Sequence, residues 1–292
     1  MSADTNQQKQ ALTRQVVAEL ARQSPVVDQE CCSRYVEQCF RRVPLDDLAT
    51  ESPQALSSIV IGQLELLNKR KRGETLIRVF NPSLEKDGWE SPHTIVEMVN
   101  DDMPFLVDTA SLAMSDLDVG VHLIIHPVIR VGRSKSGLLK TIYPKRDAKG
   151  SSESMMQFQV DRKADPAAME VIRASLDRAF MDIQMAVADW GQMEEKARDA
   201  ARNLHEWAAI TDPGWLGECK AFLEWMLDDH FIFLGVRDYD VIRRGKGGEL
   251  KVCEGSGLGI LQETPDMIRS RPLSSLAINR QKPKHPFPLI IT

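Results

Sequence analysis

The spacing of apolar residues over positions 93–131 predicts a strand, a helix and a second strand. Positions 93–100 are rich in β-branched and apolar residues and are followed by the polar turn 101–104, which indicates a strand and then a turn. Over 105–118 the apolar residues recur every three or four positions and share one helical face: Leu106, Ala110, Ala113 and Leu117. Over 121–131 apolar and polar residues alternate, which predicts one long strand. Strand, helix and strand make up half of a ferredoxin-like unit.

Residues 1–75 predict a helical N-terminal segment. One helix lies over 9–23, a second over 27–39, and a third begins with Ser52 as its N-cap. The basic run at 69–72 follows the third helix, where cations complement the helix dipole, so we expect these side chains to be solvated. Contact with a phosphate group is the alternative.

Residues 76–205 predict a ferredoxin-like domain built around the strand, helix and strand described above. A short strand at 75–80 opens it, and a stretch rich in Gly, Ser and Lys at 134–153 indicates a hairpin extension or a mobile loop. Positions 155–160 predict a strand that returns beside the long one. A helix with apolar residues at three-and-four spacing then runs from 166 to about 207.

Residues 206–292 predict the start of a second α+β unit. A helix over 215–227 precedes an aromatic strand over 230–242 and a short strand over 249–253. The apolar positions from 289 onward begin a strand for which no partner follows. We therefore expect this unit to be incomplete and the chain to be a fragment of a longer polypeptide. The predicted fold class of the whole chain is α+β.

Composition narrows the class of protein. The chain has 292 residues, 42% hydrophobic and 27% charged, as in soluble globular proteins with room for two domains. Its net charge of −5 argues against a general attraction to nucleic acid or to an anionic membrane. Neither a signal peptide nor an apolar run of roughly 20 residues is present, so we expect a cytoplasmic protein. The five cysteines include no CxxC pair and predict neither a disulfide framework nor a zinc site.

Two motifs that resemble ligand sites have simpler interpretations. The glycines Gly255, Gly257 and Gly259 follow a strand, but their spacing departs from GxGxxG, so we expect a turn rather than a nucleotide site. On a strand, His122 and His126 lie roughly 13 Å apart, too far to share a metal ion.

Residues 228–230, two aspartates and a histidine, lie where a predicted helix meets a strand. They could serve acid–base chemistry if a pocket formed there. A cap followed by a turn is the commoner use of such residues, and we expect it here.

The turn over 100–104 is the most informative polar site. Its backbone N–H groups lead into a helix N-terminus, which favours an anion such as a carboxylate. The ligand-binding candidates are Asp101, Asp102, Met103 and Phe105. The alternative is that Asp101 and Asp102 cap the helix themselves.

Four segments, in this order, resemble the N-terminal region of the large bacterial NAD-dependent glutamate dehydrogenases: DDMPFLVD at 101–108, VGVHLIIHPVIRV at 119–131, FLEWMLDDHFIFLGVRDYD at 222–240 and GSGLGIL at 255–261. The resemblance covers nearly the whole chain. It implies regulatory domains of the ACT type here and a dehydrogenase domain further along the polypeptide. There L-glutamate, NAD and water would give 2-oxoglutarate, ammonium and NADH, a reaction of amino-acid catabolism. It thus implies no catalytic residue and no cofactor in this chain, with NAD bound elsewhere in the parent protein.

The resemblance also implies partners, namely the remainder of the polypeptide, further copies in a homo-oligomer and an amino-acid effector. ACT domains are βαββαβ units that often bind amino acids between copies, and their first turn resembles D-x-P-G. Residues 102–105 match all but the glycine. Because a phenylalanine there would fill the space of a small ligand, we expect Phe105 to pack within the protein and the domain to mediate subunit contacts.

Two other functions stay open from the sequence. One is an allosteric sensor that binds an amino acid at the turn over 101–105. The other, less favoured, is a nucleic-acid-binding ferredoxin-like sheet, because this architecture serves many functions. That sheet needs exposed aromatic residues on a basic face, and this sequence offers few.

Overall fold

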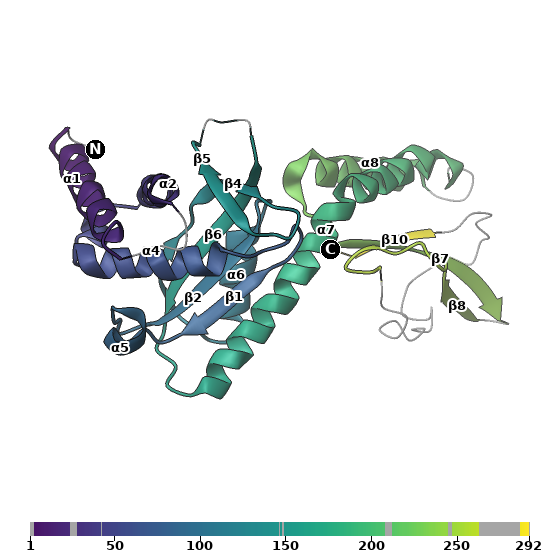
Figure 1. The fold of residues 1–292 in the computed structure, drawn as a ribbon. Coiled ribbons are helices and arrows are strands. Elements are labelled where there is room, and N and C mark those ends of the chain that lie inside the picture. The colour runs from purple at the N-terminus through teal and green to yellow at the C-terminus, as the bar shows by residue number, and fades with distance from the viewer. Residues whose placement is uncertain are drawn as a thin grey trace. The chain divides into compact units, whose positions relative to one another are not determined.

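The computed structural model describes residues 3–23, 28–41, 43–145, 147, 149–207, 212–244, 247–262 and 287–291. They form an α+β fold, as the sequence predicts, in two compact units, Met1–Phe180 and Met181–Thr292 (Figure 1). The long helix α7, Pro166–Asn203, takes part in both units. The domain boundaries expected at 75 and 205 stay predictions. Among the described residues, no helix has both the length and the apolar character that crossing a membrane requires.

The N-terminal segment of the first unit is helical. Its helices are α1 (Ala3–Leu20), α2 (Gln29–Phe40), α3 (Leu45–Leu48) and α4 (Pro53–Leu67). Asp28 caps α2 by accepting a hydrogen bond from the backbone N–H of Cys31 at 2.8 Å. Ser52 caps α4 in the same way, with its hydroxyl 3.1 Å from the nitrogen of Ala55. The predicted start of this helix is confirmed.

In the described part of the first unit, six strands form an antiparallel sheet. They are β1 (Leu76–Phe80), β2 (Thr94–Asp101), β3 (Val121–Ile125), β4 (Val128–Arg133), β5 (Leu139–Tyr143) and β6 (Ser151–Val160), in the order β1-β2-β6-β4-β5 with β3 beside β6. The short helix α5 (Leu84–Asp87) follows β1, and α6 (Leu106–Ser115) connects β2 to β3. The strand on the outer side of β2 is β1, which precedes the strand-helix-strand unit in the sequence.

The long strand predicted over 121–131 is wrong in one respect, because it is two strands, β3 and β4. Both pair with β6, and across the break the N–H of Met155 donates to the carbonyl of Pro127 at 3.0 Å. Proline has no N–H to give to the ladder, so the regular pairing stops there. Burial alternates along both strands, as the pattern predicts.

The stretch 134–153 contains the hairpin extension that its composition indicated. β5 lies within it and pairs with β4, and β6 begins earlier than predicted, at Ser151. Leu139 also donates its N–H to the carbonyl of Asn68 at 2.8 Å. The hairpin therefore pairs with the chain that leaves α4.

The second unit combines helices with a smaller antiparallel sheet. After α7 come the 3-10 helix η1 (Leu204–Trp207), helix α8 (Pro213–Trp225) and a π-helical turn η2 (Met226–His230). The described strands are β10 (Phe287–Ile291), β7 (Gly235–Arg244) and β8 (Gly247–Val252), in that order, with β9 (Leu258–Gly259) beside β7. The last strand, for which no later partner was expected, pairs with the earlier strand β7.

Both faces of the larger sheet are buried at strand β2. Val99 of β2 belongs to a core cluster that includes apolar residues of α1, α2 and α4. Since neighbouring residues of a strand point to opposite faces, Val96 and Met98 lie on the other face, where they are also fully buried. The apolar face predicted for α6 is buried at Leu106 and Ala110. β2 therefore lies between two other strands of the sheet and is buried on both faces.

A buried polar network joins the helices to this sheet. The hydroxyl of Tyr35 in α2 donates to Gln63 of α4 at 2.9 Å, and Gln63 donates to Gln157 of β6 at 2.6 Å. On β2, the buried Glu97 accepts a hydrogen bond from Nε of Arg78 at 2.9 Å. Burial raises the pKa of Glu97 above its ordinary value, although the Arg78 guanidinium opposes the shift.

We expect Glu97→Gln to remove a pH dependence of stability. Because the pKa of Glu97 is raised on folding, the folded chain holds this proton more tightly than the unfolded chain does. Stability therefore falls as pH rises from the ordinary value of 4.5 through the folded pKa. One such group gives a slope of at most about 1.4 kcal/mol per pH unit. Urea unfolding across this range should show the wild type losing stability relative to Glu97→Gln, and parallel curves would contradict the raised pKa.

Candidate functional site

Asp101 ends β2, and its carboxylate is engaged inside the first unit. It forms an ion pair with Arg70 and accepts a hydrogen bond from the backbone N–H of Gly73 at 2.9 Å. The side chain of Arg70 is only 1% exposed, so the expectation that the run 69–72 is solvated is wrong for this residue. Helix α4 ends at Leu67, before the run, so these cations do not lie in its last turn.

A second carboxylate completes a buried charge network around Arg70. Glu153 of β6 lies 3.3 Å from Arg70 and accepts two hydrogen bonds from Arg133, at 2.6 and 2.7 Å. Arg70 also donates to two backbone carbonyls of its own turn. Buried charges are tolerated when they are paired and hydrogen-bonded in this way. The network therefore occupies Asp101 with an internal partner. The sequence signal for it is weak, because Glu153 is flanked by Ser152 and Ser154 rather than by apolar residues.

Asp101, one of the two aspartates expected to cap α6, pairs with Arg70 instead. The N-cap residue is Phe105, which makes no side-chain capping bond. Its backbone is left-handed, with φ 68° and ψ 6°, a conformation that is costly for a residue with a Cβ. Asp102 is exposed, and its N–H donates to the carbonyl of Ser152 at 3.1 Å. Met103 is half-buried beside it. Ligand binding by these residues stays a prediction.

Asn100 is the polar residue of this site that the sequence pattern did not single out. It is fully buried on β2, and neither the oxygen nor the nitrogen of its amide has a hydrogen-bond partner. It lies opposite Ser154 of β6, whose hydroxyl is 2.7 Å from Nε2 of His126. A buried amide without partners is costly. The signal that could have identified it is an asparagine inside an apolar strand.

The glycine motif at 255–261 is a packed turn of the second unit. Asp189 of α7 accepts a hydrogen bond from the N–H of Gly259 at 2.7 Å. A Cβ at Gly259 would lie 2.1 Å from the carbonyl oxygen of Leu234, and one at Gly257 would meet backbone just as closely. The close approach of the backbone therefore requires glycine at both places.

The histidines at 122 and 126 have different partners. His122 pairs with Asp161 at 2.8 Å and its ring lies 4.4 Å from that of His93, whereas His126 contacts Ser154. In the part of the chain that the structure describes, no group of three or more His, Cys, Asp or Glu residues could hold a metal ion.

Residues 228–230 form the turn that ends α8. Asp229 is left-handed, with φ 56°, and Nδ1 of His230 is 3.0 Å from the carbonyl oxygen of Trp225. The strand predicted from 230 begins only at Gly235. The geometry is that of a turn, as expected for these residues.

Comparison with known proteins gives consistent matches. The family model described as "Glutamate dehydrogenase, ACT1 domain" matches residues 35–176. The NAD-specific glutamate dehydrogenase of Pseudomonas aeruginosa is 32% identical over 228 residues, which cover 77% of this chain and 14% of the relative. That of Halomonas elongata is 32% identical over 243 residues, which cover 82% of this chain and 15% of the relative. The matched region is thus a small part of each curated relative.

We expect Arg70→Ala to destabilise the chain by about 3–5 kcal/mol, because it leaves two carboxylates without their shared cation. Lys71→Ala is the matched control, since Lys71 is the next basic residue and is exposed, and it should change stability by less than about 0.5 kcal/mol. Denaturant unfolding of both variants measures the difference. A loss below about 1 kcal/mol for Arg70→Ala would show that the network is dispensable.

Proposed function

Because this chain belongs to the family of large NAD-specific glutamate dehydrogenases and matches its ACT-like N-terminal region, we propose that it is a non-catalytic regulatory and assembly region of such an enzyme. The proposed reaction of the whole protein converts L-glutamate, NAD and water to 2-oxoglutarate, ammonium and NADH, with NAD bound outside this chain. The engagement of Asp101 by Arg70 and the packed glycine motif support a structural rather than a catalytic use of these residues.

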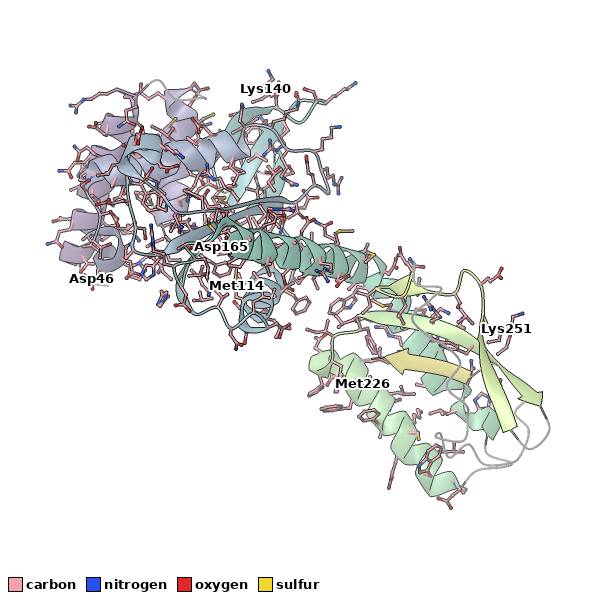
Figure 2. The ribbon with its side chains drawn as sticks, turned by 90° about the horizontal axis from the view of Figure 1, so that it is seen from below. Asp46, Met114, Lys140, Asp165, Met226 and Lys251 are labelled. Atoms are coloured by element: carbon pink, nitrogen blue, oxygen red, sulfur yellow. The ribbon has the colours of Figure 1, made fainter. Side chains whose placement is uncertain are left out.

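A cluster of exposed aromatic side chains on α8 and the chain after it carries the assembly part of the proposal. Trp215, Phe222 and Trp225 are 56%, 54% and 45% exposed. Phe222 stacks on Trp225 with 5.9 Å between ring centroids, and Phe231 meets both rings edge-on. Figure 2 shows the side chains that project from α8. The labelled Met226 directly follows this helix and is buried. Exposed apolar surface of this extent is typical of a protein contact, here with a second copy or with the remainder of the polypeptide.

We expect the chain to self-associate in solution and to form no NADH from glutamate and NAD. Because the aromatic cluster supplies the contact, changing both Phe222 and Trp225 to Ser should weaken association at least tenfold, or about 1.4 kcal/mol. Leu84→Ser on α5 is the control, because Leu84 is a 64% exposed apolar residue outside the cluster. Sedimentation equilibrium and an absorbance assay for NADH provide the measurements. A strict monomer would overturn self-association through this cluster, and NADH formation would overturn the non-catalytic role.

Asn100 favours a second function, an allosteric sensor of an amino acid. The open donor and acceptor of its amide match the carboxylate and ammonium groups of such a ligand. Asn100 immediately precedes the turn over 101–105, where α6 begins without a side-chain cap, and a helix N-terminus favours a carboxylate. Phe105, in place of the glycine of related turns, reduces the room for that ligand.

We expect a sensed amino acid to stabilise the chain by about 2.7 kcal/mol at one hundred times its Kd. Thermal unfolding across the amino acids, with 2-oxoglutarate and NAD for comparison, measures this. Asn100→Leu keeps the branched shape of the side chain but removes the polar atoms, so the free variant should be at least as stable as the wild type and should no longer respond. Asp102→Ala tests the turn itself. If no amino acid stabilises the wild type, the sensor is excluded, and if Asn100→Leu responds equally, Asn100 is not part of the site.

A further inference from the structure

A cavity of about 550 Å³ lies in the second unit between the end of α7 and α8. Arg198, Arg202 and His205 line it from α7 and η1, and Lys220 and Glu224 line it from α8. Its volume falls within the range of small-molecule sites. No residue of the turn over 100–105 takes part in it.

The charged residues of the cavity lie on two facing helical surfaces. Arg198, Arg202 and His205 are spaced by four and then three positions, so they share one side of the helix. Lys220 and Glu224 are one turn apart on α8, with 3.7 Å between the ammonium and the carboxylate. Three permanent cations against one carboxylate leave a net charge of +2 in the lining, before any charge on His205. The cavity therefore favours an anion.

The two arginines have only exposed ion pairs along their own helix. Arg198 pairs with Glu194 at 3.0 Å and with Glu195 at 3.5 Å, and Arg202 pairs with Glu195 at 2.6 Å and with Asp199 at 2.5 Å. The arginine side chains are 44% and 58% exposed, and none of the three acids lines the cavity. Exposed pairs of this kind contribute little, so the guanidinium groups can exchange them for a bound anion. The planar guanidinium suits both phosphate and carboxylate.

The remaining lining is small and apolar, and it includes Leu204, Leu216 and Gly217. A Cβ built at Gly217 meets nothing within 4 Å, so the glycine leaves open space at this wall. A bare inorganic ion would not use this surface. The lining fits an anion that carries an apolar body.

We propose that this cavity binds a small organic anion, with its phosphate or carboxylate groups on Arg198 and Arg202 and its apolar body against Leu204 and Leu216. This site is separate from the regulatory function proposed above and goes beyond it.

Calorimetric titration of the full chain with ADP, phthalate and pyrophosphate tests the site. We expect ADP or phthalate to bind, and the change of both Arg198 and Arg202 to Gln to weaken binding at least tenfold. Gly217→Leu should abolish binding, because its side chain enters the cavity without a clash at Cβ. Gly191→Leu is the matched control, since a Cβ on this α7 glycine also meets nothing within 4 Å, and it should bind as the wild type does. Both leucines favour helix over glycine, so the fold should be kept.

The outcomes separate the sources of the anion. Binding of ADP alone assigns a phosphate, binding of phthalate alone assigns a carboxylate, and either result supports the site. The proposal is overturned if neither compound binds, if Gly217→Leu binds as tightly as the wild type, or if pyrophosphate binds as tightly as ADP.

Discussion

The pairing of charges around the buried Arg70, at the ends of β2 and β6, is the constraint on which the first unit depends. Asp101 and Glu153 lie directly opposite each other in the ladder, so two acids meet at one end of a buried sheet. Arg70 supplies the cation between them, and Arg133 binds the second acid from β4. The chain that leaves α4 must therefore return to the sheet at this point, which fixes where the helical segment ends and where β1 begins. Apolar contact alone would not specify that junction, because apolar contact has no direction.

Signals that act within a few residues of the sequence were enough to predict much of the fold. The cap at Ser52 and the apolar spacing of α6 are of this kind, and both match the structure. The burial of Arg70 was not predictable in this way, because its partners lie on strands far along the chain. The pairing of β10 with β7 is likewise non-local. From the sequence alone, a basic run is therefore expected to be solvated, because the acids that pair with it are distant in the chain.

The candidate turn over 100–105 also combines features that local sequence signals predict with features that depend on distant residues. Its position between β2 and α6 followed from the pattern, but the use of each polar group did not. Asp101 serves Arg70 rather than the helix, and Phe105 takes the left-handed place that glycine would occupy without strain. Asn100 points to the opposite face from Asp101, because the two are neighbours on one strand. The adjacent residues 100 and 101 thus lie in different environments. Asp101 is held in an ion pair with Arg70, whereas the amide of Asn100 has no hydrogen-bond partner.

In the second unit, the described residues leave most of helix α8 unburied. Of its thirteen residues only Leu216 is buried, whereas Trp215, Phe222 and Trp225 stay about half exposed. Asp212 caps its first turn with a carboxylate oxygen 3.0 Å from the nitrogen of Trp215, which favours the helix locally. A helix of this length gains most of its stability from packing of an apolar face rather than from propensity or caps. The aromatic residues supply such a face, and the contact proposed above, with a second copy or with the remainder of the polypeptide, would supply the missing packing.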